Sequence, residues 1–418
     1  MPPCDTCLRR TRDGQKKQEL WNIYPAMEHT KDERAALCAL NRIFGFDPKT
    51  GLRLMEDLGG AMAVFSDPST SREALLSYSK SKFAPSLCVG AFETAAMELE
   101  GLEEQGCRFI GIGEAGYPGL LMECEDPPIG LYYKGVSPPQ DVFEGLPQVA
   151  VIGTRNITYY GKTWCRRIVE AMSKAGVTPL VVSGLALGVD VTAHREALDD
   201  GLPTVAVMAT GIDRMYPQRN RDVGERIAST PRCALVSDYP PGTEAVALNF
   251  IRRNRIIAGI CRATILVESR IKGGGMMTAR LASSYGRDVY ALPGRIDDPA
   301  SQGCNLLIRE NIAEQIGDLG ELVRKLGLGT SSLVLKDDFK TSVEAFYKDR
   351  QPPEESEDLV RLALLVKGHA GISLDELCGR LKWTFSRVSG LATTLECDGF
   401  ISVDLLQHCH PLTKKPLF

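Results

Sequence analysis

The most regular pattern in the chain is an alternation of short apolar runs with amphipathic segments between residues 148 and 312. The apolar runs are rich in β-branched residues and lie near 149–152, 179–183, 203–208, 233–237, 263–268 and 288–292. Segments with helical spacing separate them, such as 162–175 and 276–285. Short strands joined by helices are typical of a parallel sheet with crossover connections. We therefore predict an α/β fold with a Rossmann-like parallel-sheet core over residues 107–320.

A different pattern precedes this segment. Residues 31–65 place leucines and isoleucines at helical spacing in two runs, which Gly45-Phe46-Asp47-Pro48 separates. This predicts a small helical module over residues 31–106, of SAM or helix-hairpin-helix type. Its turn lacks the Gly-x-Gly of a DNA-binding hairpin, so a packing role is favoured over DNA contact. Residues 1–30 are polar with little period and are predicted to form an N-terminal tail.

After the sheet segment the pattern fades, and residues 321–357 are interpreted as a linker with its plainest stretch at 351–355. Residues 358–418 are predicted to form a winged-helix module. Ser373 and Glu376 have the spacing of a capping box, Trp383–Cys397 is a second helix, and a strand ends near Val403. Such modules bind DNA or protein, and the acidic residues near the second helix leave both open.

Composition places the protein among globular chains without a membrane span. Hydrophobic residues make up 44% of the 418 positions, and none of the apolar runs approaches the ~20 residues that a membrane helix needs. The N-terminus lacks the basic and apolar regions of a signal peptide. We expect a cytoplasmic protein with no membrane partner.

The net charge of −4 hides an asymmetry. Residues 149–312 hold 21 Lys and Arg against 15 Asp and Glu, a net charge of +6, so the rest of the chain carries −10. Arginine supplies 18 of those 21 cations, and its planar fork suits phosphate contacts. A solvated surface is the simpler alternative, but the charge favours an anionic partner for the sheet domain.

The 13 cysteines lie mostly in apolar segments, where a cytoplasmic chain uses them as small core residues. Cys4 and Cys7 have zinc-like spacing, but no clear second pair accompanies them. We therefore expect neither a metal nor a cofactor.

Two predicted strands end in small-residue turns. Gly153-Thr154-Arg155 follows the first, and Ser183-Gly184 follows the second. Such turns let a phosphate approach backbone N–H groups, and Arg155 can neutralise it. A plain strand-to-helix turn is the alternative for each. Neither turn has the spacing of a dinucleotide fingerprint or a P-loop.

A third turn-rich segment, Gly211–Asn220, follows another strand. Arg214, Arg219 and Asn220 can contact phosphate or sugar there. Met215 or Tyr216 either offers a stacking face for an unpaired base or belongs to the core, and the sequence leaves both open.

Asn249-Phe250-Ile251-Arg252-Arg253-Asn254-Arg255 is the most unusual run. We interpret it as the start of an otherwise apolar helix, where the dipole disfavours cations unless an anion binds. Upstream, Asp190 and His194 share a helix face. An orienting role in the loop is favoured for this pair over acid–base catalysis, since neither a nucleophile nor a metal set accompanies it.

Together these segments resemble the DprA (Smf) family of DNA-processing proteins. The match rests on short motifs in the family's order: Gly153–Arg155, Ser183–Asp190, Asp213–Pro217, Arg253–Gly259, Leu292–Gly294 and Gly303–Ile308. The resemblance implies a single-stranded DNA-binding protein of natural transformation, without catalysis. It protects incoming strands, loads the RecA recombinase and works as a homodimer. Lys272 and Asp238 depart from the family pattern; the lysine would suit phosphate.

From the resemblance and the motifs we predict one DNA-binding set of residues. Its members are Gly153, Arg155, Ser183, Gly184, Arg214, Asn220, Arg252, Arg253, Asn254 and Lys272. Two other classes remain open. One is a nucleotide-processing enzyme of phosphoribohydrolase type, whose glycine-rich turn Gly273-Gly274-Gly275 only partly matches. The other is a nucleotide-sensing regulator coupled to a winged helix.

Overall fold

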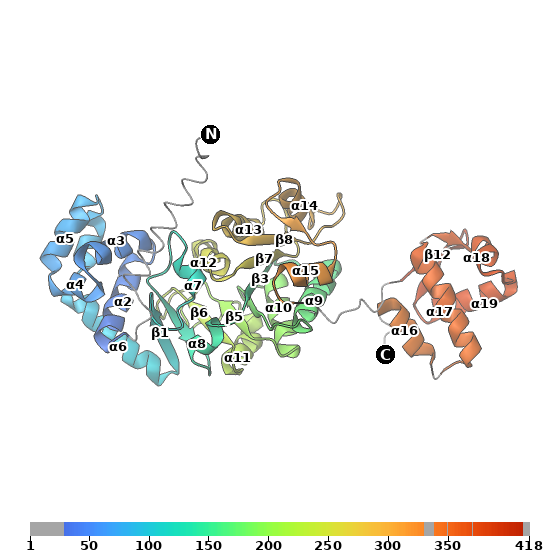
Figure 1. The fold of residues 1–418 in the computed structure, drawn as a ribbon, viewed down its shortest axis with the longest axis horizontal. Coiled ribbons are helices and arrows are strands. Elements are labelled where there is room, and N and C mark those ends of the chain that lie inside the picture. The colour runs from blue at the N-terminus through green and yellow to red at the C-terminus, as the bar shows by residue number, and fades with distance from the viewer. Residues whose placement is uncertain (1–28, 330–337, 349, 370, 413–418) are drawn as a thin grey trace. The chain divides into compact units, whose positions relative to one another are not determined.

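The computed structural model describes residues 29–329, 338–348, 350–369 and 371–412. The chain divides into two compact units, Met1–Ser332 and Leu333–Phe418, shown in Figure 1. Residues 1–28 of the predicted N-terminal tail, including Cys4 and Cys7, lie outside the described residues. Among the described helices none is long and apolar enough to cross a membrane.

The first unit is built on a nine-stranded sheet with the order β1-β2-β6-β5-β4-β3-β7-β8-β9. Its strands are β1 (Cys107–Gly111), β2 (Gly130–Lys134), β3 (Gln148–Ile152), β4 (Leu180–Ser183), β5 (Thr204–Val207), β6 (Ala234–Ser237), β7 (Ala263–Leu266), β8 (Asp288–Ala291) and β9 (Glu314–Gln315). From β6 to β9 every pairing is parallel, whereas β1 and β2 join antiparallel at the β6 side.

The strand order reverses at β3, because β4 pairs on one side of it and β7 on the other. Open parallel sheets bind ligands outside the carboxyl ends of the strands at such a point. The six strands predicted from the apolar runs are confirmed within two residues at either end. The sequence pattern did not predict β1, β2 or β9.

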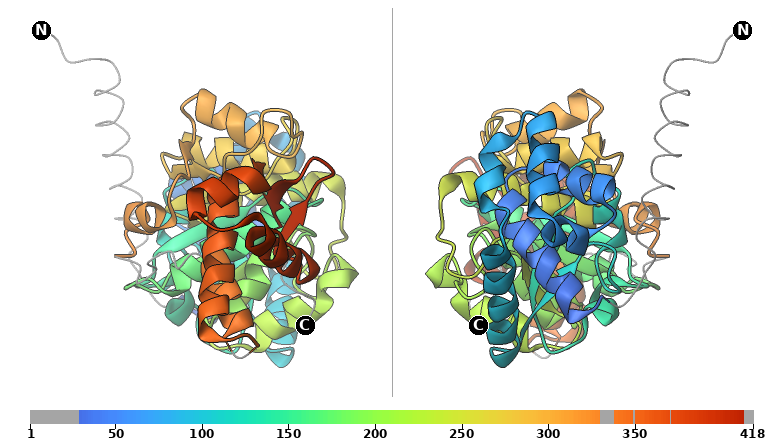
Figure 2. Two further views of the ribbon diagram at one scale, coloured as in Figure 1. Left: turned by 90° about the vertical axis from the view of Figure 1, so that its right-hand side faces the viewer. Right: turned by 90° about the vertical axis from the view of Figure 1, so that its left-hand side faces the viewer.

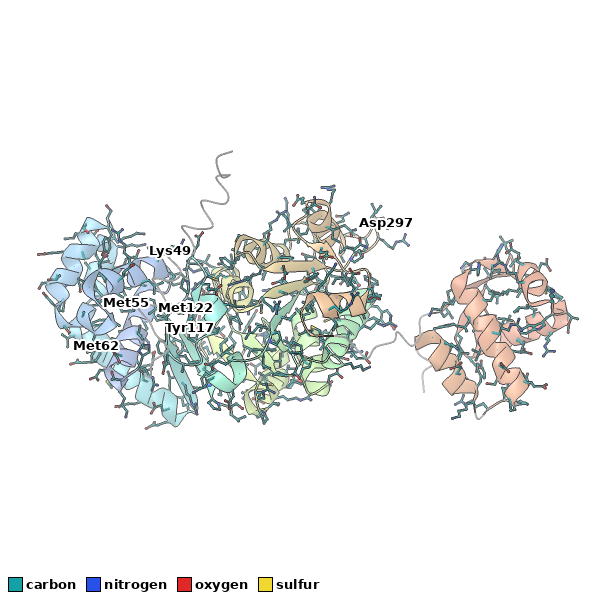
Figure 3. The ribbon with its side chains drawn as sticks, in the orientation of Figure 1. Lys49, Met55, Met62, Tyr117, Met122 and Asp297 are labelled. Carbon is teal, nitrogen blue, oxygen red and sulfur yellow. The ribbon has the colours of Figure 1, made fainter. Side chains whose placement is uncertain are left out.

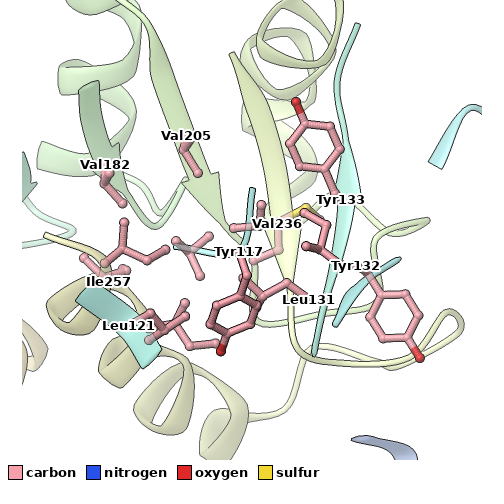
Figure 4. Close-up of a cluster of buried hydrophobic side chains, with 14 of the residues drawn as sticks. Tyr117, Leu121, Leu131, Tyr132, Tyr133, Val182, Val205, Val236 and Ile257 are labelled. Carbon is pink, nitrogen blue, oxygen red and sulfur yellow. The ribbon is translucent and has the colours of Figure 1, made fainter. Parts of the chain in front are cut away.

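Helices connect the parallel strands. They are α9 (Tyr159–Ser173), α10 (Val189–Asp199), η2 (Gln218–Asn220), α11 (Arg221–Ser229), α12 (Ala247–Ile260), α13 (Gly274–Ser284), α14 (Gln302–Arg309) and α15 (Leu319–Lys325). Valines of β4, β5 and β6 are fully buried beneath Ile257 of α12 and Leu121 of the short helix α7 (Gly119–Met122), as Figure 4 shows. This apolar layer fixes α12 against the sheet.

The helical N-terminal segment packs beside β1 and β2 in the same unit. It consists of α2 (Lys31–Phe44), α3 (Pro48–Leu58), α4 (Ala61–Ser66), α5 (Pro68–Ser77), η1 (Ser81–Ser86) and α6 (Val89–Glu104). The right-hand view of Figure 2 shows these helices from their outer side. Figure 3 labels Met55 and Met62 among them, and Tyr117 and Met122 where the chain reaches the sheet.

Buried hydrogen bonds join this helical segment to the sheet. The Asn41 side chain donates to the Asp238 carbonyl oxygen over 3.0 Å and accepts from the Gly130 N–H over 3.3 Å. The Tyr132 hydroxyl donates to Glu98 of α6 over 2.7 Å. Unpaired buried polar groups are costly, so these bonds fix the segment that follows β6. The packing role predicted for the helical segment agrees with these contacts.

Two expectations are corrected here. Helix α12 begins at Ala247, not at the arginines, so Arg252–Arg255 lie one to two turns inside it and the dipole argument does not apply. The expected linker over 321–357 contains the end of α15, the helix α16 (Asp338–Tyr347) and the start of α17 (Pro353–Gly368). Helix α15 packs on α9, and α16 packs on α17, because each has apolar residues to bury.

The second unit has its own apolar core. Its elements after α17 are β10 (Ile372–Ser373), α18 (Leu374–Leu381), α19 (Phe385–Cys397), β11 (Ile401–Val403) and β12 (His408–Pro411). The predicted capping box of Ser373 and Glu376 is confirmed. β12 lies between β10 and β11 in an antiparallel sheet, which the sequence pattern did not predict.

Candidate nucleic-acid interface

The loops after β3, β5 and β7 all leave the carboxyl edge of the parallel sheet. They contain four exposed cations that form no ion pair with any described residue: Arg155, Arg219, Arg270 and Lys272. On the helices, in contrast, exposed arginines such as Arg166, Arg195 and Arg226 each pair with a carboxylate. Four unneutralised cations therefore lie at the carboxyl edge, where phosphate can reach them.

Arg155 lies at the reversal point of the sheet. Its guanidinium carbon is 5.0 Å from the centre of the Phe250 ring of α12, and its side chain is exposed. The preceding Gly153 has no room for a side chain, because an added Cβ would lie 2.5 Å from Val189. Close packing of β3 against α10 thus accounts for Gly153 and brings Arg155 to the edge.

An aromatic pair extends from Arg155. The Phe250 ring also meets the Tyr216 ring, with centres 5.5 Å apart, and Tyr216 is 47% exposed. Tyr216 is thus a surface residue, which settles its open assignment, while Met215 is partly buried. Two rings beside an unpaired arginine form a surface on which bases can stack.

The turn after β4 is held from within. The Ser183 hydroxyl donates to the Val151 carbonyl over 2.7 Å. The Asp190 carboxylate accepts from the backbone N–H groups of Gly184 and Ala186, over 3.2 and 3.4 Å. The expected orienting role of Asp190 is thereby confirmed. Ser183 is fully buried, so its hydroxyl stabilises the turn.

Arg253 supports the same turn from α12. Its guanidinium donates to the Gly184 carbonyl over 2.8 Å and also to the Val207 carbonyl at the end of β5. An added Cβ on Gly184 would lie 2.5 Å from this guanidinium. Burial lowers the pKa of Arg253 to about 10, although the nearby Asp190 favours its charged form. The arginine therefore stays charged at neutral pH.

This burial corrects one expectation. Arg253 is only 3% exposed, so its side chain is not free to serve a ligand alone, and removing it would affect the fold. The physical reason is the close approach of β4, β5 and α12, whose carbonyl groups need a donor. Contact between Arg253 and DNA remains a prediction.

His194 lies deeper in the same region. It is fully buried, and its Nδ1 lies 2.7 Å from the Thr204 hydroxyl. Burial, with a smaller effect of the Arg253 charge, lowers the pKa of His194 to about 3. A neutral imidazole locked in the core has a structural role, in agreement with the interpretation favoured from sequence.

The other α12 residues face different neighbours. Arg252 donates to the Gly45 carbonyl over 3.2 Å and lies 4.4 Å from the centre of the Phe46 ring, so it faces the helical segment. Arg255 is buried and pairs with Asp238 over 2.8 Å. Asn254 is half-buried and makes no side-chain hydrogen bond to any described residue, so its amide is available to a ligand.

Of the remaining predicted residues, some are buried and hydrogen-bonded to the backbone, and others are exposed. Asn220 is 2% exposed, and its amide donates to the Leu185 carbonyl over 2.9 Å. Arg214 is exposed and pairs with Glu244 over 3.3 Å. Lys272 is exposed beside α13. The structure thus brings Arg155, Gly184, Asn220 and Arg253 together around the turns after β3 and β4, with Lys272 on the β7 side.

A buried carboxylate occupies the N-terminus of α9. Glu268, directly after β7, is fully buried and accepts from the Thr158 backbone N–H over 2.9 Å and from the Thr158 hydroxyl. A Cβ on Gly161 would collide with the same carboxyl group. Helix N-termini at such positions bind phosphate in dinucleotide folds. Here the protein's own anion fills that position.

Sequence reasoning missed Phe250, Glu268 and Arg270. Phe250 lies within the arginine-rich run, where the charges drew attention, although an aromatic residue beside arginines is itself a signal for base stacking. Glu268 is a single acidic residue in an apolar strand run, which is a detectable sign of a buried, hydrogen-bonded carboxylate. Nothing local distinguishes Arg270.

Comparison with known proteins gives a consistent result. The sequence model of the family described as DNA recombination-mediator protein A matches residues 108–327. Protein Smf of Synechocystis sp. is 33% identical over 73% of this chain and 80% of its own length. DNA processing protein DprA of Streptococcus pneumoniae is 39% identical over 46% of this chain and 66% of its own length.

Among solved structures, the X-ray structure of DNA processing protein A from Streptococcus pneumoniae superposes with a TM-score of 0.57 and 28% identity. The match covers 72% of this chain and 99% of that chain.

Proposed function

The chain belongs to the DNA recombination-mediator protein A family, and from this premise we propose that its sheet domain binds single-stranded DNA at the carboxyl edge. The observation that carries the proposal is that the unneutralised Arg155 covers the Phe250 ring of α12, which in turn meets the exposed Tyr216 ring of the loop after β5. The DNA phosphates bind the cations, and these contacts supply most of the affinity. The unpaired bases stack on the aromatic rings.

Single strands suit this surface better than duplex DNA. The bases of a duplex are stacked on one another and cannot reach Phe250 or Tyr216 without being extruded, which costs a few kcal/mol per base. A single strand exposes its bases at no such cost. Arg155, in the turn that follows β3, is positioned to bind a phosphate next to the stacked base.

We propose further that the DNA-bound protein serves natural transformation by protecting incoming strands and passing them to the RecA recombinase. The family's description as a recombination mediator supports this role. A homodimer is proposed from the same resemblance. Binding without catalysis is also part of the proposal. The carboxylates beside the turns after β3 and β4, Asp190 and Glu268, are buried and accept hydrogen bonds from backbone N–H groups.

The nucleotide-processing and nucleotide-sensing alternatives receive less support. Both need a phosphate held at the reversal point of the sheet, where the α9 N-terminus already carries the Glu268 carboxylate. A nucleotide phosphate would meet this negative charge. An extended strand avoids the conflict, because its phosphates can lie over Arg155 and the outer loops.

For the second unit we propose a winged-helix assignment from the order of α17, α18, α19 and the β11–β12 hairpin. Arg387 on α19 is paired with Asp358, and Glu396 is exposed on the same helix. This charge pattern supports a supplementary role for the unit rather than the main DNA contact.

An electrophoretic mobility-shift series tests the proposed function. The full chain is incubated with a labelled single strand, with the matching duplex, and with the single strand in the presence of excess mononucleotide. The proposal expects the single strand to shift at lower protein concentration than the duplex, and the shift to persist in the presence of excess mononucleotide. Equal competition by mononucleotide, or release of free base from it, would favour the alternatives instead.

A further inference from the structure

A groove with a volume of about 770 Å³ lies between the loop after β5, helix α11 and the end of β2. Its lining includes Asp213, Arg214 and Tyr216 of the loop, Arg221 and Ser229 of α11, and Lys134 of β2. The volume falls within the roughly 300–1,000 Å³ of sites that hold small molecules. Of the residues predicted to bind DNA, only Arg214 lines this groove.

The groove is continuous with the proposed DNA surface. Tyr216 lines the groove, and its ring meets the Phe250 ring, which Arg155 covers. A strand whose phosphate lies on Arg155 and whose base stacks on Phe250 therefore has Tyr216 as its next neighbour. The following base can therefore reach the groove through Tyr216.

Charge indicates which part of a nucleotide enters. Arg214 pairs with Glu244 over 3.3 Å and Arg221 with Glu225 over 2.6 Å. Of the charged lining residues, this leaves Lys134 and Asp213 with no ion pair to any described residue. One positive and one negative group nearly cancel, so the groove does not concentrate phosphate. A neutral ring with polar edges fits it better.

Asp213 gives the groove a preference among bases. One of its carboxylate oxygens accepts from the Gly242 backbone N–H over 2.9 Å, and the other has no donor among the described residues. A carboxylate only accepts hydrogen bonds, and in base contacts it accepts from exocyclic amino groups such as that of cytosine. Thymine has no amino group, and its ring N–H lies between two carbonyl oxygens that repel a carboxylate. We propose that this groove binds an unpaired base of the DNA strand and prefers an amino-bearing base to thymine; this rests on the proposed single-strand binding.

The test measures the affinity of the full chain for oligo-dC and oligo-dT of equal length by fluorescence anisotropy. The unaltered protein is expected to bind oligo-dC about tenfold more tightly, the discrimination typical of one good base contact. Asp213→Asn keeps an oxygen for the Gly242 N–H but presents an amide donor. This variant is expected to lose the preference while retaining affinity for oligo-dT.

A second variant tests the groove by filling it. Ser229 is the exposed last residue of α11, and Ser229→Trp is expected to reduce the dC preference. Ser284, the exposed last residue of α13, lies away from the groove, so Ser284→Trp serves as the matched control and should keep the preference. Equal binding of oligo-dC and oligo-dT by the unaltered protein, or a preference that survives both Asp213→Asn and Ser229→Trp, overturns the inference. Failure to bind either strand would instead overturn the proposed function.

Discussion

Arg155 and Arg253 lie close together at the carboxyl edge of the sheet, yet their surroundings give them different roles. Arg155 is exposed, and its side chain contacts the Phe250 ring, whereas Arg253 is buried and donates to the carbonyl groups of Gly184 and Val207. The same side chain is therefore accessible to a ligand at one position and bonded to the backbone at the other. The burial of each side chain and its hydrogen-bond partners distinguish the two roles, and neither can be read from the sequence.

Replacement of Arg253 tests its structural role. Arg253→Ala would leave two buried carbonyl groups without this donor and Asp190 without its nearby cation. Removing one partner of a buried charged pair costs about 3–5 kcal/mol, and we expect a loss of this size in the free energy of unfolding, measured by urea denaturation followed by circular dichroism. The exposed Arg155→Ala should stay within about 0.5 kcal/mol of the unaltered protein. Similar small losses for both variants would contradict the assignment.

His194 predicts an acid dependence of stability. Its pKa is lowered to about 3 by burial, while an unfolded histidine titrates near 6.5. As pH falls below that value, the unfolded state takes up a proton that the folded state does not. The His194 contribution to the free energy of unfolding should then fall by about 2 kcal/mol between pH 6.5 and 5.

The His194→Gln variant isolates this effect. Its stability should depend less on pH over that range than the stability of the unaltered protein, as measured by urea denaturation at several pH values. Asp190 acts in the opposite sense, because burial raises its pKa and the cost of its ionised form disappears as it protonates. It therefore offsets part of the loss at the acid end. Parallel pH profiles for the two proteins would show that His194 is not responsible.

At the scale of elements, the local pattern of apolar residues was sufficient to predict the strands of the parallel core. Each of those strands is a short apolar run because both of its faces are buried. Such a run can be recognised in the sequence without knowledge of the neighbouring strands. The strands β1, β2 and β12 were not predicted. Strand β2 pairs with β6, which lies far along the chain, whereas β12 forms a hairpin with the neighbouring β11 but consists of His408-Cys409-His410-Pro411, which is not an apolar run. The start of α12 was misplaced for a related reason. Its arginines looked like a helix end, but tertiary contacts bury Arg253 and Arg255 in the helix interior.

The candidate site was predictable to a similar extent. Motif positions after strands were sufficient to place these residues at the carboxyl edge of the sheet, since strand ends are visible in sequence. Which motif residues are exposed and which are buried and bonded to the backbone was not predictable, because this depends on which carbonyl groups lie nearby. Ser183 and Asn220 both bond to backbone carbonyl groups of neighbouring segments, which only the folded chain brings together.

The second unit provides a prediction at this scale. A chain ending at Gly329 keeps Leu328, which is fully buried and whose carbonyl accepts from the Val177 N–H over 2.9 Å. This truncated protein should retain its affinity for single-stranded DNA, because the unpaired cations and rings all lie in the first unit. Anisotropy titrations of both proteins give the comparison. A loss beyond about tenfold, or 1.4 kcal/mol, would assign a share of the binding to the second unit.

At the scale of the whole molecule, the charge distribution explains how an acidic protein can bind DNA. The net charge is −4, but residues 149–312 carry +6. Ion pairs neutralise several cations on the helices, whereas four exposed cations in the loops at the carboxyl edge form no ion pair with any described residue. Binding should therefore depend on that edge and on salt rather than on the overall charge.

The salt dependence of single-strand binding, compared between the unaltered protein and Arg155→Ala, tests the central claim most directly. Each phosphate contact contributes a slope of about −0.7 in log affinity against log salt. One charge-assisted contact is worth about 1.5–3 kcal/mol, so Arg155→Ala should bind roughly ten- to a hundredfold more weakly, with a slope shallower by about 0.7. Arg166→Ala, which removes an ion-paired arginine of α9, should change neither value. If Arg155→Ala instead keeps the affinity and the slope of the unaltered protein while its circular dichroism spectrum is unchanged, the DNA does not bind at this edge.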